Sequence, residues 1–203
     1  MSQLFIDNDV LIKAAHWSLL DEIPEFVGMP WHQISAGASL IYRAKANDCK
    51  LFRSESIAQC LASRLQLMSE LPPPDETVTT LLQGEIDLDV GEVALIGALC
   101  SQPTALMLTG DKRALRALSR AHLDGIHARV RGRVLCLEQL LEFIANKQGC
   151  QALVDKIEPH RQLDAAVRCI IGTSSPVDDH SVRDGLSSYI AGLQSECNGL
   201  LRA

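Results

Sequence analysis

The stretch Leu88–Leu118, LDVGEVALIGALCSQPTALMLTGDKRALRAL, decides which fold we expect of this chain. It predicts a helix whose first turn carries Asp89 and Glu92, then a short apolar strand over Ala105–Leu108, and then a second helix that begins at Asp111. Strand and helix alternate, and acidic side chains stand where the elements join. Because ligands in open α/β sheets bind outside the carboxyl ends of the strands, these acids are candidates for a functional site.

A second strand-to-helix junction lies at the N-terminus. Leu4–Ile6 form a short apolar run that predicts a strand, and Asp7 and Asp9 follow it directly. Apolar residues at helical spacing begin at Val10, so a helix is expected after the two acids. Asp7 or Asn8 suffices as the N-cap of that helix, so two carboxylates are more than capping requires.

The rest of the chain divides into a core domain and a helical extension. We expect a helix over residues 31–47 and a last strand over residues 126–136, and the α/β core domain is predicted to span residues 1–149. Residues 150–203 are predicted to be helical and to pack on the core or on a partner. The segment Thr173–Asp179 is expected to be a flexible loop. The last helix carries an apolar stripe, which also makes a homodimer through the C-terminal helices an expected arrangement.

Composition predicts an ordinary globular protein of one domain. The 203 residues are 47% hydrophobic and 22% charged, and no apolar run approaches the roughly 18 residues that a membrane span needs. The N-terminal segment lacks the basic region of a secretory signal, so a cytoplasmic location and no membrane partner are expected. The seven cysteines form no Cys-x-x-Cys pair, which argues against a disulfide framework or a zinc site and favours reduced, buried thiols.

Charge is unevenly distributed along the chain. The net charge is −6, but Lys112–Arg133 holds seven basic residues and one acid and so carries +6, which leaves −12 on the remainder. A basic segment directly after Asp111 suits a substrate with a phosphate backbone, and Lys112, Arg113 and Arg116 are the candidate phosphate-binding residues. A solvated helix face explains the same charges equally well.

Carboxylates at strand-to-helix junctions are the chemistry that the sequence offers, because the nucleotide-binding, serine-hydrolase and zinc-protease motifs are absent. The set is Asp7, Asp9, Asp89, Glu92 and Asp111. Hard oxygen ligands select Mg²⁺ or Mn²⁺, and converging carboxylates persist either with a divalent cation or with raised pKa values. Each acid also has a structural explanation, since Asp89 and Glu92 fit a capping box and Asp111 fits an N-cap.

Three segments resemble the PIN-domain (PIN-like) nucleases, a family of small α/β metal-dependent ribonucleases. They are Asp7–Leu11 (DNDVL) after the first strand, Leu88–Glu92 (LDVGE) at a helix start, and Leu108–Lys112 (LTGDK) after a strand. The resemblance covers residues 3–145 and leaves the C-terminal tail outside. It implies a three-layer α/β/α fold with a short parallel central sheet, to which the C-terminal helices are added.

The resemblance also implies an activity. Such an enzyme hydrolyses phosphodiester bonds as an endoribonuclease, and Asp7, Glu92 and Asp111 are the implied catalytic residues. Together with Asp9 and Asp89 they are the implied ligands of one or two Mg²⁺ or Mn²⁺ ions, which lower the pKa of the attacking water and neutralise charge on the phosphate. RNA is the implied partner, and the sequence identifies no protein inhibitor.

One position departs from the family pattern. PIN nucleases generally carry a further Glu on a helix midway between the first and third acids. Residues 34–46 offer Ser39 and Tyr42 there and no acid, and Glu55 lies later in the chain. This departure keeps open a second hypothesis, in which the chain is a catalytically degenerate PIN-like domain that acts as a binding module.

A third hypothesis is a phosphatase. Asp7-Asn8-Asp9 after an apolar strand also resembles the first motif of the haloacid-dehalogenase-type phosphatases, in which the first Asp is a phosphorylated nucleophile and the second is the acid and base. Leu11 stands where that family has Thr or Val, and Leu115 stands where it has a second Asp after its later Gly-Asp pair. The nuclease hypothesis therefore fits the residues better.

Overall fold

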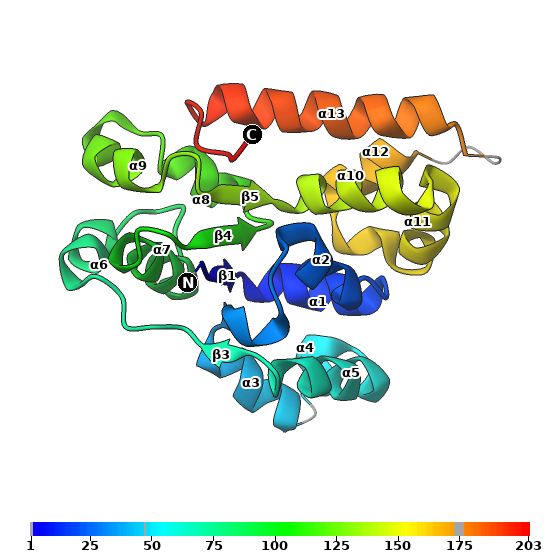
Figure 1. Cartoon of the computed structure of the whole chain (residues 1–203), viewed down its shortest axis with the longest axis horizontal. Coiled ribbons are helices and arrows are strands. Elements are labelled where there is room, and N and C mark those ends of the chain that lie inside the picture. The colour runs from blue at the N-terminus through cyan, green and yellow to red at the C-terminus, as the bar shows by residue number, and fades with distance from the viewer. Residues whose placement is uncertain (1, 47, 173–176) are drawn as a thin grey trace.

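The computed structural model describes residues 2–46, 48–172 and 177–203. Its centre is one sheet in which all neighbouring strands are parallel, in the order β3-β2-β1-β4-β5 (Figure 1). The predicted α/β class, with helices on both faces of a parallel sheet, is confirmed. The strands are β1 (Leu4–Ile6), β2 (Ile34–Ala36), β3 (Ser69–Glu70), β4 (Leu106–Thr109) and β5 (Val134–Cys136).

Helices form the two outer layers. In Figure 1, α6, α7 and α9 lie on one side of the strands, while α1, α2, α10, α11 and α12 lie on the other. The α-helices are α1 (Asn8–His16), α2 (Ile23–Val27), α3 (Ala38–Lys45), α4 (Cys49–Phe52), α5 (Glu55–Leu65), α6 (Glu76–Leu82), α7 (Val90–Ser101), α8 (Lys112–Ala117), α9 (Asp124–Val130), α10 (Leu137–Gln148), α11 (Cys150–Ile157), α12 (Ala165–Ile171) and α13 (Asp179–Glu196). Short 3₁₀ turns complete the connections at η1 (Leu20–Glu22), η2 (Trp31–Gln33), η3 (Ala121–Leu123) and η4 (Glu158–Leu163).

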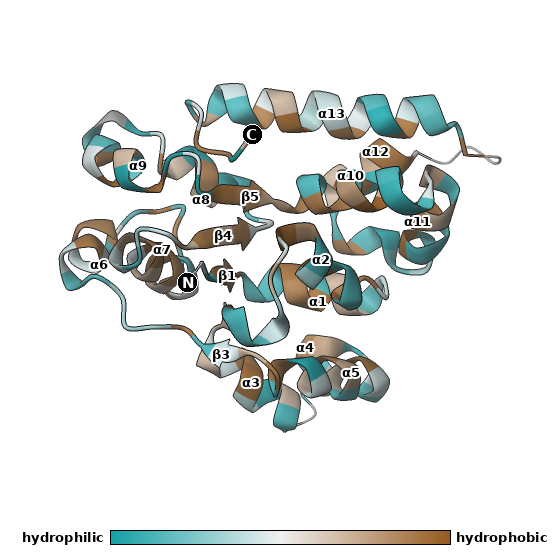
Figure 2. Cartoon of the chain, in the orientation of Figure 1, coloured by the Kyte–Doolittle hydropathy of each residue, from teal (hydrophilic) through white to brown (hydrophobic). Residues whose placement is uncertain are grey.

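The side chains of β1 alternate between the two faces of the sheet and so enter two separate cores. Leu4 and Ile6 belong to the cluster that contains α1 and α10, whereas Phe5 belongs to the cluster that contains α7 and α9. All three side chains are completely buried. A strand covered on both faces requires consecutive apolar residues, which is why β1 reads Leu-Phe-Ile (Figure 2).

The C-terminal segment completes both cores. α13 contributes Val182 and Leu186 to the cluster that contains α1, and Leu193 to the cluster that contains α7. These three residues of its apolar stripe are thus buried within the same chain. After α13, the backbone N of Arg202 donates to O of Val134 at 2.7 Å. The last residues therefore pair with the outer edge of β5, which would otherwise be open to another strand.

Two predicted elements differ from the structure. The expectation of a single helix over residues 31–47 is wrong, because Ile34–Ala36 form β2 and α3 starts after it. A three-residue strand buried on both faces shows no alternation that marks it in the sequence. The last strand is shorter than expected, since residues up to 130 belong to α9. Gly132, with φ of +69°, turns the chain between α9 and β5.

The chain continues from the core domain into the extension without a linker. Gly149 alone separates α10 from α11, and both helices pack in the same cluster as β1. Within the described residues, no helix combines the length and the apolar character that a membrane span requires. Residues 173–176 of the predicted loop Thr173–Asp179 lie outside the described residues.

We expect Leu186→Ala to lower the free energy of unfolding of the whole chain by about 2–5 kcal/mol, because Leu186 is 1% exposed in the core shared with β1. Urea unfolding followed by circular dichroism should show one shifted transition. Leu81→Ala is the matched control, since Leu81 is 61% exposed and its loss should change stability by no more than about 0.5 kcal/mol. A separate early transition in Leu186→Ala would instead show that the C-terminal helices unfold independently.

Candidate active site

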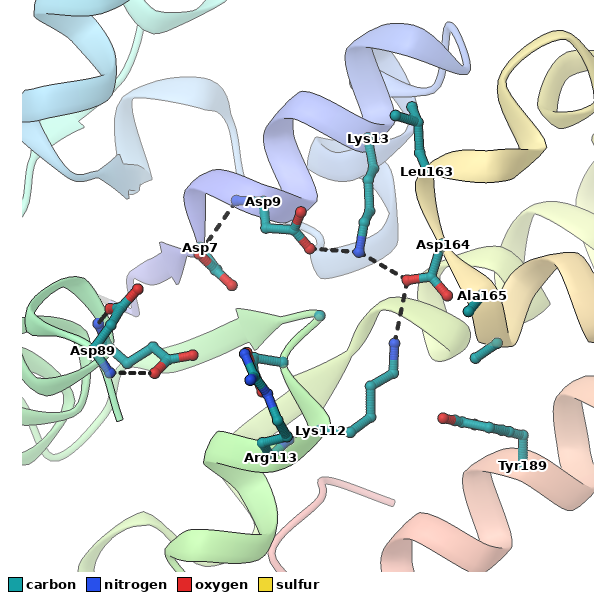
Figure 3. Close-up of a pocket in the computed structure, with 14 residues that line it drawn as sticks. Asp7, Asp9, Lys13, Asp89, Lys112, Arg113, Leu163, Asp164, Ala165 and Tyr189 are labelled. Carbon is teal, nitrogen blue, oxygen red and sulfur yellow. Dashed lines mark hydrogen bonds and ion pairs between the residues drawn. The ribbon is translucent and has the colours of Figure 1, made fainter. Parts of the chain in front are cut away.

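The candidate site lies at the carboxyl ends of the two central strands, β1 and β4. From β1 the chain crosses to β2 on one side, whereas β4 lies on the other side, so the loops after β1 and β4 diverge and leave a crevice. An open cavity of about 490 Å³ occupies this place (Figure 3). It is lined by Asp7, Asp9, Lys13, Asp89, Glu92, Gly110, Asp111, Lys112, Arg113, Leu163, Asp164, Ala165, Ala166 and Tyr189. All five acids chosen from the sequence are in this lining.

Asp7 is positioned by the pairing of β1 with β4. Its backbone N donates to O of Leu108 at 2.9 Å, and as N-cap of α1 its Oδ1 accepts from N of Asp9 at 3.3 Å. Oγ1 of Thr109 donates to Oδ2 of Asp7 at 3.1 Å. Burial raises the pKa of Asp7 above its usual value, and the negative charges of Asp9 and Asp111 add to this effect, so the carboxylate is destabilised where it stands.

Asp111 is the N-cap of α8, as predicted. Its Oδ1 accepts from N of Arg113 at 2.7 Å and from N of Ala114 at 3.0 Å, and its Oδ2 lies 3.3 Å from the Arg113 guanidinium. Its own backbone N donates to Oγ1 of Thr109 at 3.1 Å. Since the same hydroxyl donates to Asp7, Thr109 links the carboxylate of Asp7 to the backbone of Asp111.

Asp89 and Glu92 form the predicted capping box at the start of α7. N of Asp89 donates to Oε2 of Glu92 at 2.7 Å, and N of Glu92 donates to Oδ1 of Asp89 at 2.8 Å. Burial and the nearby charge of Asp111 raise the pKa of Glu92 to about 7, and the two carboxyl groups share a hydrogen bond. Burial also opposes ionisation of Asp111, but backbone donors outweigh it and hold the pKa of Asp111 below its usual value. Glu92 therefore holds the proton that the pair shares.

A chain of ion pairs forms the opposite wall of the cavity (Figure 3). Nζ of Lys13 lies 2.5 Å from Oδ2 of Asp9 and 2.8 Å from Oδ2 of Asp164. Nζ of Lys112 lies 3.4 Å from that same oxygen of Asp164 and 2.8 Å from Oε1 of Glu138, whose side chain is completely buried. Asp164 precedes α12, so a carboxylate of the C-terminal segment joins two lysines of the core.

The lysines of this wall stay charged across the neutral range. Burial lowers the pKa values of Lys13 and Lys112, but the carboxylates around them outweigh burial and both pKa values lie above the usual value. Burial likewise opposes ionisation of Asp164, yet the ammonium groups of Lys112 and Lys13 keep the pKa of Asp164 below its usual value. The wall is therefore a fixed arrangement of full charges in a mostly buried place.

Three lining residues with polar or charged side chains, Lys13, Asp164 and Tyr189, were not predicted from the sequence. Lys13 did carry a local signal, because it lies four residues after Asp9 on the same helix, the spacing of a helical ion pair. Asp164 shows only the local pattern of an N-cap, which it forms by accepting from N of Val167 at 3.0 Å. Tyr189 stands in an amphipathic helix with no local sign of a site. Asp164 and Tyr189 come from the extension, so only the tertiary fold brings them here.

The basic run Lys112–Arg133 does not form one positive surface at the cavity. Three of its arginines pair with acids from other segments: Arg116 with Glu196, Arg120 with Glu85 and Asp87, and Arg129 with Asp75. Of the three residues predicted to bind phosphate, Lys112 is buried among carboxylates, Arg116 lies outside the lining, and Arg113 lines the cavity with its side chain 76% exposed. Arg113 is thus the candidate that the structure leaves accessible.

The carboxylates share a cavity but are not assembled around a common point. In the described parts of the chain, no three His, Cys, Asp or Glu side chains are arranged to hold a metal ion. The lining takes no acid from α3 or α5, so among the described residues nothing replaces the midway acid. No protein-family model, no curated protein and no solved structure matches the chain significantly. Its function is therefore inferred from the residues of this cavity.

We expect Asp164→Asn to lower the free energy of unfolding by about 2 kcal/mol, less than the loss of a whole buried pair because each lysine keeps a second carboxylate. Asn preserves the N-cap, so the loss of stability measures the contribution of the negative charge of Asp164. Urea unfolding gives the value. The matched control is Asp178→Asn, an exposed N-cap of α13 that accepts from N of His180 and should change stability by about 0.5 kcal/mol or less. Equal changes in the two variants would contradict the role of the ion pairs.

In protein freed of divalent ions with EDTA, the carboxyl group of Glu92 should titrate near pH 7. Because its folded pKa exceeds its ordinary value of 4.5, the native state binds this proton more tightly than the unfolded chain does. The stability that the proton contributes is therefore present below about pH 4.5 and is lost as the pH rises to about 7. Carbon NMR of the carboxyl group measures the midpoint, and Asp111→Asn should lower it. A wild-type midpoint at the ordinary value would show that neither burial nor Asp111 raises the pKa of Glu92.

Proposed function

We propose that this chain is a Mg²⁺- or Mn²⁺-dependent nuclease that hydrolyses phosphodiester bonds, with RNA as its substrate. The observation that supports it most is that Asp7, Glu92 and Asp111 line one cavity at the switch point of a parallel sheet. Asp7 and Asp111 lie at the strand-to-helix junctions after β1 and β4. Glu92 does not, because α7 follows α6 and not a strand, so the prediction of a strand-to-helix junction there is wrong. Capping explains each acid separately, but it does not require that the three line the same cavity.

The chemistry of the acidic residues, though not their arrangement, suits a hard divalent cation. The donors that face the cavity are carboxylate oxygens, and its described lining contains no His or Cys. Burial and neighbouring negative charge raise the pKa values of Asp7 and Glu92, and a bound cation would favour the ionised forms of both. Asp7, Glu92 and Asp111 would hold the cation, with Asp9 and Asp89 beside them. Binding would release the proton on Glu92, so affinity should increase with pH.

The chain's own side chains supply the remaining parts of the reaction. When bound, the cation lowers the pKa of the attacking water and neutralises charge on the phosphate. Arg113 offers an exposed guanidinium at the cavity mouth for a flanking phosphate. The ammonium group of Lys13 is held by Asp9 and Asp164 and so presents a fixed positive charge on the opposite wall.

RNA and the cytoplasm are the proposed substrate and place of action. The resemblance to PIN-like nucleases, carried by the segments around Asp7, Glu92 and Asp111, favours RNA over other phosphodiesters. The described cysteines, which are Cys60, Cys100, Cys136, Cys150, Cys169 and Cys197, are free thiols. Free thiols in buried and exposed positions are typical of proteins in a reducing compartment, which supports the cytoplasm.

Asp7→Asn and Asp111→Asn should each abolish Mn²⁺-dependent cleavage of a labelled single-stranded RNA while leaving the protein folded, because Asn keeps the N-cap but removes the charged ligand. Asp178→Asn is the matched control, an N-cap aspartate outside the cavity, and should cleave as the wild type does. Calorimetry should show a Mn²⁺ site in the wild type and in Asp178→Asn that is lost in the other two variants.

Full cleavage by Asp7→Asn would rule out this site as the catalytic centre. A wild-type protein that binds no Mn²⁺ through Asp7 and Asp111 would be the degenerate binding module. An aspartyl-phosphate trapped on Asp7 would instead identify the phosphatase.

A further inference from the structure

A second cavity, of about 540 Å³, adjoins the candidate active site. The two share Ala165, Ala166 and Tyr189, and the second extends between α12 and α13 along Cys169, Ile170, Ser181 and Gly185. Its described lining carries no charged side chain, whereas the first cavity holds acids and lysines. A phosphate would find its partners only in the first cavity. The second suits the flat, neutral part of a nucleotide, which is its base.

Tyr189 stands where the two cavities meet. Its ring projects from α13 beside Ala165, and Nζ of Lys112 lies 5.9 Å from the ring centre (Figure 3). Among the described residues that line the two cavities, Tyr189 is the one aromatic side chain. The ring is partly exposed, so a flat ligand can reach it. Aromatic rings beside a phosphate-binding groove stack unpaired bases, since every base presents a π-face.

Two of the four helix neighbours of Tyr189 on α13 are glycines, and the other two are Leu186 and Leu193. Residues three and four positions apart share a helix face, and the positions four before and three after Tyr189 are Gly185 and Gly192. Glycine weakens a helix interior, so two glycines on one face call for an explanation. At Gly185 a Cβ would lie 3.2 Å from Cγ2 of Ile170, so this glycine allows α12 and α13 to pack closely. At Gly192 a Cβ would meet nothing within 4 Å, so packing does not explain that glycine.

We propose that α12 and α13 form a base-binding subsite in which an unpaired nucleobase of a single-stranded nucleic acid stacks on the ring of Tyr189. This subsite rests on the proposed function, because it takes the nucleotide next to the phosphate that a cation at Asp7, Glu92 and Asp111 would hold. Stacked bases inside a duplex are not available to such a ring. The C-terminal extension thereby makes the enzyme selective for single strands.

Binding measurements in a cleavage-deficient background test the subsite. The background is Asp7→Asn, which is expected neither to cleave nor to hold the cation, and the probes are a fluorescein-labelled single-stranded RNA of about ten nucleotides, the DNA of the same sequence and the RNA duplex. Tyr189→Ala should weaken single-strand binding by roughly ten-fold, as loss of one stacked base does, and Tyr189→Phe should retain it. Tyr42→Ala is the matched control, because Tyr42 is the chain's other tyrosine and is 76% exposed on α3.

An abasic scan separates stacking from a structural role of Tyr189. One abasic position in the single strand should weaken binding to the Asp7→Asn protein about as much as Tyr189→Ala does. The same abasic strand should bind the Tyr189→Ala protein no more weakly than the intact strand, because both changes remove one interaction. If Tyr189 only supported the fold, the abasic position and Tyr189→Ala would each weaken binding independently.

The outcomes distinguish this subsite from the nuclease activity. Tyr189-dependent binding without metal-dependent cleavage by the wild type would keep the subsite and overturn the nuclease. Three results would overturn the subsite even if cleavage is intact. They are single-strand binding that is unchanged in Tyr189→Ala, duplex binding that Tyr189→Ala weakens equally, and no binding of either single strand. If Tyr189→Ala weakens binding of only the RNA strand or only the DNA strand, the result supports the subsite and identifies the sugar that it accepts.

Discussion

The parallel pairing of β1 with β4 determines where everything else in this structure must lie. The hydrogen bond from N of Asp7 to O of Leu108 continues that ladder one residue beyond β1, which places Asp7 at the carboxyl edge beside Thr109. Thr109 then donates to Asp7 and accepts from N of Asp111, so the two junctions are joined by one hydroxyl. Because parallel strands need helical crossovers on both faces, the same pairing also requires the two separate cores.

The extension is coupled to this edge through charge. Asp164 is the carboxylate by which the C-terminal segment reaches Lys13 of α1 and Lys112 of α8, and it does so at 6% exposure. A buried ion pair adds little net stability compared with an apolar contact. If α12 packed in another position, however, buried charges would be left without partners, which is unfavourable. The pairing therefore specifies how α12 docks on the core. Docking in turn fixes the second half of the cavity, including Tyr189.

Sequence patterns predicted what depends on neighbours along the chain. The runs at β1 and β4, the capping box of Asp89 and the N-cap of Asp111 were all predicted, because each follows from a few adjacent residues. β2 was not, since Ile-Ser-Ala carries no periodicity and only pairing on both sides makes it a strand. The ion pairs of the basic run and the contribution of Asp164 depend on contacts between distant segments. No local pattern encodes such contacts.

Capping and ligand binding are compatible roles for the same carboxylate, because each cap uses one oxygen. Backbone donors reach Oδ1 of Asp7, Oδ1 of Asp89 and Oδ1 of Asp111. The exposed guanidinium of Arg113 donates to the second oxygen of Asp111. The hydroxyl of Thr109, a group that can both donate and accept, donates to the second oxygen of Asp7. Capping therefore occupies one oxygen of each acid with backbone donors and leaves the other to side-chain partners. The structural role of these acids as caps is therefore compatible with the proposed cation site.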